Sequence, residues 1–174
     1  GYERLMNNFV RILVILVIAG LVATETSAQT VIGNFGDWTV FKDSTGKNRV
    51  CYIVSEPKKE TGKYKSRGDT YIMLTSRPAE KSRDVFELRA GYSYKKASEV
   101  AVRISNRVFT LFTDGGTAWA YDSKVDRALA RAMIGGRDML VTGYSSRGNK
   151  TVDTYSLTGF TAAYKAMNKA CGLR

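Results

Sequence analysis

The chain has 174 residues and a net charge of +11. It contains no histidine, which excludes histidine-based acid–base catalysis, Ser-His-Asp and Cys-His nucleophilic sites, and most transition-metal sites. The sequence also has no glycine-rich phosphate loop of the Walker or dinucleotide-binding type. We therefore expect a protein that is not an enzyme and that holds no cofactor and no metal, and the surplus positive charge favours anionic partners.

The N-terminus has the features of a secretory signal peptide. Met6 is a suitable start, Arg11 supplies the positive charge, and residues 12–19 form an unbroken apolar run. Thr26-Ser27-Ala28 then provides a cleavage site of the small-x-small type. We predict a signal peptide over residues 1–28, whose removal leaves the net charge at +11 because its acidic and basic residues cancel.

Export implies one mature domain over residues 29–174, located in the periplasm, at the outer membrane or outside the cell. The alternative is a retained anchor helix over residues 9–23. Arg11 interrupts that stretch, and it is shorter than the roughly 20 residues that a bilayer span needs. With the leader cleaved, we expect membrane contact to be peripheral only.

Cys51 and Cys171 are the only cysteines. Thiols pair in the oxidising compartments that exported proteins reach, so we predict a disulfide between these two residues. Closing a loop of this length stabilises a fold by about 4–5 kcal/mol. The alternative is two independent buried thiols, which behave as small apolar side chains.

From residue 38 onward, short segments rich in β-branched and aromatic residues alternate with turns that contain Gly, Pro, Asn or Asp. We expect about nine strands, at residues 38–42, 49–55, 71–77, 85–92, 100–104, 107–112, 117–121, 139–144 and 152–157. Their spacing is typical of antiparallel hairpins.

Two helices are also expected, the first capped by Asp122 or Ser123 and the second ended by Gly172. Each has one apolar face, made of Val125, Leu129, Ala132 and Met133 in the first and of Phe160, Ala163, Tyr164 and Met167 in the second. The sequence therefore predicts a mainly β protein, either an antiparallel β-sandwich or a partly open barrel, with two short covering helices.

The most polar and basic stretch is residues 58–69, which has no apolar period and is expected to be a loop. Its basic side chains are Lys58, Lys59, Lys63, Lys65 and Arg67. A loop outside the sheet can present such side chains together, so these five are the candidate site for an anionic partner. A solvated loop that binds nothing has the same composition.

Two further patterns suggest other functions. Asp114 and Asp122 flank the segment that contains Trp119 and could form an acid pair able to hydrolyse a glycosidic bond, although a turn and a helix cap explain them better. Arg67-Gly68-Asp69 spells an RGD adhesion tripeptide, but three-residue motifs often occur by chance.

Four segments resemble the invasion-associated locus B family of alphaproteobacterial exported proteins: "FGDWTVF", "CYIVSEP", "VFTLFTDGGTAWA" and "RGNKTVDTYSLTGFTAAYKAMNKAC". The resemblance covers essentially residues 35–171. It implies a β-rich periplasmic or envelope domain and, for some members, a part in host-cell invasion or survival under stress. The family has no established catalytic residues, so the resemblance assigns none to this chain.

These observations predict a non-enzymatic exported protein of the periplasm or envelope. Its expected partner is an anionic component of the envelope or of a host surface, or an envelope protein, and not nucleic acid. The alternatives are a carboxylate-based hydrolase of the envelope and a membrane-anchored accessory subunit of an envelope complex.

Overall fold

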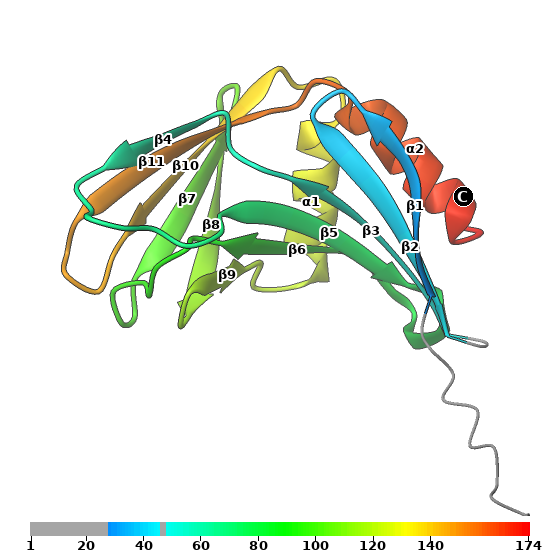
Figure 1. The fold of residues 1–174 in the computed structure, drawn as a ribbon, viewed down its shortest axis with the longest axis horizontal. Coiled ribbons are helices and arrows are strands. Elements are labelled where there is room, and N and C mark those ends of the chain that lie inside the picture. The colour runs from blue at the N-terminus through cyan, green and yellow to red at the C-terminus, as the bar shows by residue number, and fades with distance from the viewer. Residues whose placement is uncertain (1–27, 46–47) are drawn as a thin grey trace, which may run out of the picture.

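The computed structural model describes residues 28–45 and 48–174 (Figure 1). Apart from Ala28, the predicted signal peptide lies outside the described residues. The first strand begins at Ala28.

Within these residues, eleven strands form one antiparallel sheet with the order β1-β2-β3-β5-β6-β9-β8-β7-β10-β11-β4. The strands are β1 (Ala28–Phe35), β2 (Trp38–Thr45), β3 (Asn48–Ser55), β4 (Lys59–Gly62), β5 (Tyr71–Arg77), β6 (Ser82–Arg89), β7 (Glu99–Ile104), β8 (Arg107–Asp114), β9 (Thr117–Trp119), β10 (Asp138–Tyr144) and β11 (Lys150–Ser156). The two edges are β1 and β4, so the sheet is not closed into a barrel. The prediction of a mainly β, antiparallel fold is confirmed.

Two α-helices, α1 (Ser123–Met133) and α2 (Phe160–Ala170), cover parts of this sheet, and a short 3-10 helix, η1 (Pro78–Glu80), follows β5. The sheet is strongly curved, with β4 near one end of the molecule and α2 at the other (Figure 1). α1 packs against β6 and β8, and α2 packs against β1, β2 and β3. The predicted cap of α1 is Asp122, whose Oδ1 accepts hydrogen bonds from the backbone N–H groups of Lys124 and Val125, both at 2.9 Å.

Two of the strands were not expected from the sequence. β1 precedes the first predicted strand, and β4 lies inside the stretch predicted to be a loop, so that prediction was wrong for Lys59–Gly62. All four residues of β4 are exposed, and β4 pairs with β11 on one side only. A strand that buries no side chain leaves no apolar alternation in its sequence, and therefore periodicity cannot reveal it.

The core is one cluster whose buried members run from Trp38 on β2 to Cys171 after α2. Trp38 on β2 donates a hydrogen bond from Nε1 to the Ser156 carbonyl at 3.0 Å and meets the Phe160 ring edge-on at 5.1 Å. Cys51 on β3 and Cys171 at the end of α2 are buried and form the predicted disulfide. The disulfide thus joins the end of α2 covalently to β3.

A close contact between two glycines positions the segment that follows β4. The Gly68 N–H donates to the Gly91 carbonyl at 2.8 Å. A Cβ on Gly91 would lie 2.3 Å from the Gly68 carbonyl oxygen, and Gly91 has a φ of +75°. Only glycine fits both the space and the conformation, and this contact holds the segment before β5 against the loop after β6.

Candidate functional site: a basic cavity at the β4 end

The candidate site lies at the end of the molecule that β4 borders. We call this region the β4 end; it comprises β4, residues 63–67, the loop 91–94 after β6, and the turn 145–149 between β10 and β11. The strands of the β10–β11 hairpin were predicted from two segments rich in β-branched and aromatic residues, and they begin and end within two residues of the predicted bounds. Pairing of β4 with β11 brings the basic segment beside this turn.

Arg67 lies inside the β4 end and not on its surface. Only 3% of its side chain is exposed. Nη1 and Nη2 donate to the two carboxylate oxygens of Asp153 at 2.7 and 2.6 Å, and Nε donates to the Ala90 carbonyl at 2.7 Å. Burial lowers the pKa of Arg67, but Asp153, with smaller contributions from Tyr64 and Glu60, raises it by more, so the guanidinium remains charged.

Two tyrosines enclose this guanidinium. The Tyr64 and Tyr92 ring centroids lie 5.3 and 5.1 Å from Cζ of Arg67, within the range of cation–π contacts. The Tyr92 hydroxyl forms a 2.6 Å hydrogen bond with Thr151 Oγ1, and burial raises the pKa of Tyr92. The outcome is an aromatic surface that packs against a buried ion pair.

A cavity of about 700 Å³ opens above this surface. It is lined by Lys63, Tyr64, Lys65, Ser66, Tyr92, Ser145, Ser146, Arg147, Asn149 and Thr151. The lysines come from the segment after β4, and Arg147 comes from the β10–β11 turn. Three cationic side chains therefore surround a concave site that also contains hydroxyl, amide and aromatic groups.

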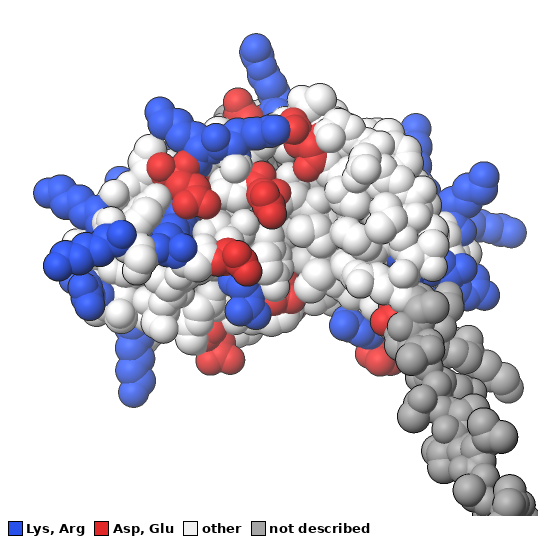
Figure 2. Space-filling model, viewed as in Figure 1, with Lys and Arg blue, Asp and Glu red and all other residues white. Residues whose placement is uncertain are grey.

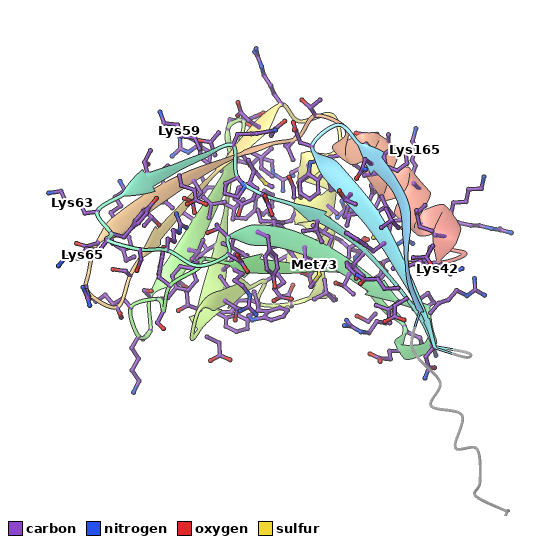
Figure 3. The ribbon with its side chains drawn as sticks, in the orientation of Figure 1. Lys42, Lys59, Lys63, Lys65, Met73 and Lys165 are labelled. Carbon is purple, nitrogen blue, oxygen red and sulfur yellow. A yellow bond between two sulfur atoms is a disulfide. The ribbon has the colours of Figure 1, made fainter. Side chains whose placement is uncertain are left out.

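The basic side chains of the surface are not evenly spread. Figure 2 shows them gathered at the β4 end and again at the α2 end, with acidic side chains between. Lys59, Lys63 and Lys65 lie at the first end, whereas Lys42 and Lys165 lie at the second (Figure 3). A cavity lies among the cations of the β4 end.

The structure separates the five basic residues predicted to act together. Lys63 and Lys65 line the cavity, and Lys59 is exposed on β4. Lys58 instead forms an ion pair with Asp37, whose pKa is lowered mainly by the Lys58 hydrogen bond and less by one from Ser156. Arg67 is buried and paired with Asp153, so we do not include it among the residues proposed below to bind an anion.

The other two sequence patterns are explained by structure. Burial of the Arg67 side chain means that Arg67-Gly68-Asp69 does not present its guanidinium as an adhesion motif would. The Asp122 carboxylate caps α1, and Asp114 ends β8 in a turn where its carbonyl accepts from Thr117. Neither acid lines the cavity at the β4 end.

Sequence reasoning missed a second buried polar cluster, between β6 and the two helices. Asp84 is 2% exposed, and its Oδ2 accepts from the Tyr164 hydroxyl at 2.9 Å. Asp126 on α1 accepts from the Phe86 N–H at 2.9 Å. Burial raises the pKa of both carboxyls. This cluster joins α1 and α2 to β6, and it has a structural role.

Within the part of the chain that the structure describes, no group of three or more Cys, Asp or Glu residues could hold a metal ion. In the same part, no helix is both long and apolar enough to cross a membrane.

Comparison with known proteins yields one match. A family model described as invasion associated locus B (IalB) protein matches residues 38–168. The chain belongs to this family. No curated protein and no solved structure matches the chain.

The invasion associated locus B match runs from the start of β2 to the last turn of α2. It therefore includes every residue of the β4 end described above. Family membership suggests an invasion-associated envelope protein. The disulfide agrees with this, since disulfides persist in oxidising compartments.

Proposed function

We propose that this protein is a non-enzymatic, exported envelope protein that binds an anionic component of the envelope or of a host surface through the β4 end. The observation that carries the proposal is the position of Lys63, Lys65 and Arg147 around one cavity. They come from segments far apart in the sequence, and the β4–β11 pairing brings them together.

Electrostatics supports an anionic partner at this place. The charge of Arg67, the basic residue beneath the cavity, is balanced internally by Asp153. None of the three cations that line the cavity forms an ion pair with another described residue, and all three are exposed. Exposed charges interact over about 8 Å at physiological salt, so an anion in the cavity would interact with all three.

Family membership and chemistry both favour binding over catalysis. The family is not a known enzyme family, and the chain has no histidine. The two acids that could form a catalytic pair have other roles, since Asp122 caps α1 and Asp114 ends β8 at a turn.

The test compares two variants that lose the same charge at opposite ends. The first is Lys63→Gln/Lys65→Gln/Arg147→Gln, and the matched control is Lys42→Gln/Lys165→Gln/Lys169→Gln. Binding to vesicles containing phosphatidylglycerol, and to heparin, is measured at low and physiological salt. At about 1 kcal/mol for each charge near an anionic surface, the first variant should lose about a hundredfold in affinity.

The control should keep most of the wild-type affinity, and binding by the wild type should weaken steeply as salt rises. Equal losses in the two variants would mean that net charge alone governs binding. Equal affinity of the first variant and the wild type would show that the β4 end does not bind the anionic component.

A further inference from the structure

The cavity at the β4 end contains aromatic, hydroxyl and amide side chains in addition to the cations that binding to an anionic surface requires. A flat charged surface is matched by exposed lysines alone, whereas this site is concave and has a volume of about 700 Å³. Small-molecule sites are typically clefts of about 300–1,000 Å³ with a few placed polar groups. The shape therefore favours a discrete ligand over a membrane plane.

Tyr64 gives the cavity an aromatic wall. Its side chain is 40% exposed, and its ring lies against the buried Arg67 guanidinium. Because Asp153 and the Ala90 carbonyl hold that guanidinium in place, the ring has a fixed support. A partly exposed ring on a rigid base can stack against the apolar face of a ligand ring.

The β10–β11 turn supplies hydrogen-bonding groups to the cavity. Ser145, Ser146 and Asn149 come from the β10–β11 turn and line the same cavity. The turn is itself ordered by backbone bonds, from the Ser145 N–H to the Asn149 carbonyl at 2.9 Å and from the Ser146 N–H to the Ser93 carbonyl at 2.8 Å. Hydroxyl and amide side chains can each donate and accept, which suits the hydroxyl groups of a sugar.

From this combination we propose that the cavity binds a single sugar residue that carries a negatively charged substituent. The ring stacks on Tyr64, the hydroxyl groups bond to the β10–β11 turn, and the charged substituent lies among Lys63, Lys65 and Arg147. This inference rests on the proposed anion-binding function of the β4 end and names its ligand class. The same chemistry occurs in phosphorylated glycolipid headgroups and in free acidic polysaccharides.

Calorimetric titration of the full mature chain with four small probes tests the ligand class. The probes are glucose-6-phosphate, glucuronate, uncharged glucose and inorganic phosphate. The two charged sugars should each bind at least about fivefold more tightly than glucose, which lacks the charge. They should also bind at least about fivefold more tightly than inorganic phosphate, which lacks a ring to stack on Tyr64, and this factor is the scale of one aromatic contact. Inorganic phosphate binding as tightly as glucose-6-phosphate would overturn the sugar assignment.

Variants at Tyr64 separate this inference from the proposed function. Tyr64→Ala should remove the preference for charged sugars over inorganic phosphate, and Tyr64→Phe should retain it. An unchanged sugar preference in Tyr64→Ala would overturn the inference and leave the proposed function standing. If the wild type bound none of the anionic probes, vesicles and heparin included, both the sugar assignment and the proposed function would be overturned.

Two larger probes then identify the source of the sugar. Vesicles carrying lipopolysaccharide present the headgroup form, and polygalacturonate presents the free polymer. Tyr64-dependent binding to either one supports the proposal and identifies that source. Binding to both that is independent of Tyr64 contradicts it.

Discussion

Arg67 and Asp153 form a two-point ion pair inside the β4 end, with donor–acceptor distances of 2.7 and 2.6 Å and only 3% and 4% of their side chains exposed. The two residues are separated by 86 positions in the sequence. The pair links the segment after β4 to β11 and supports the tyrosines that border the cavity.

Removing one partner of this pair should destabilise the protein strongly. Asp153→Ala leaves the Arg67 charge buried without its main partner, at an expected cost of about 3–5 kcal/mol. Glu60 is the matched control, since it lies 3.6 Å from the same guanidinium but is 34% exposed, and Glu60→Gln should cost below about 1 kcal/mol. Urea unfolding measures both, and similar small losses would contradict a structural role for the pair.

The disulfide should account for a large part of the stability. Cys51 and Cys171 are 120 residues apart, so Cys171→Ser should cost about 4–5 kcal/mol. For a domain of this size that corresponds to a fall of about 10–20 °C in Tm. Calorimetry with and without reductant checks the value, and free thiols that titrate in the native purified protein would show that the bond is absent.

Asp84 and Asp126 should each contribute less to the free energy of unfolding as pH rises above their ordinary carboxyl pKa of 3.8. Burial raises the pKa of both in the folded protein. The folded state therefore binds more protons than the unfolded chain between the ordinary and the raised pKa, and the free energy of unfolding decreases with pH in that window.

Asp84→Asn should make that decrease smaller, since asparagine cannot ionise and tolerates the φ of 58° at this position. Urea unfolding at a series of pH values from 4 to neutral gives the slope. Parallel curves for wild type and variant would mean that Asp84 does not contribute to the pH dependence.

Tyr164 should stabilise α2 through one contact within the helix, with Phe160, and one contact with β6, at Asp84. Its ring stacks on Phe160 at 5.8 Å, and its hydroxyl donates to Asp84 at 2.9 Å. Tyr164→Ala should cost about 3 kcal/mol, whereas Tyr164→Phe keeps the ring and should cost about 1 kcal/mol. A loss below about 1 kcal/mol for Tyr164→Ala would show that α2 is loosely attached.

Much of the fold could be predicted because its signals are local. Phe86, Leu88 and Ala90 alternate with polar residues, and all three are buried. The Asp122 cap and the β10–β11 hairpin are likewise encoded in a few neighbouring residues. β4 could not be predicted, because it is a strand only by virtue of its backbone pairing with β11.

The candidate site was only partly predictable for the same reason. Lys63, Lys65 and Arg67 lie in one basic segment and have equal standing in the sequence, but only Arg67 meets a buried partner, Asp153 on β11. Arg147 was visible as a turn residue, and nothing local indicated that its turn lies beside the lysines. Composition shows that the segment is basic, but the β4–β11 pairing and the Arg67–Asp153 ion pair determine which of its charges face the cavity.

Mapping the contact by backbone amide NMR shifts tests most directly whether the β4 end is the ligand-binding surface. An acidic oligosaccharide from polygalacturonate is titrated into the ¹⁵N-labelled protein at low salt. We expect the largest shift changes in residues 63–66 and 145–149, and small changes along α2. Changes centred on α2, or spread evenly over both basic ends, would contradict binding of the ligand at the β4 end.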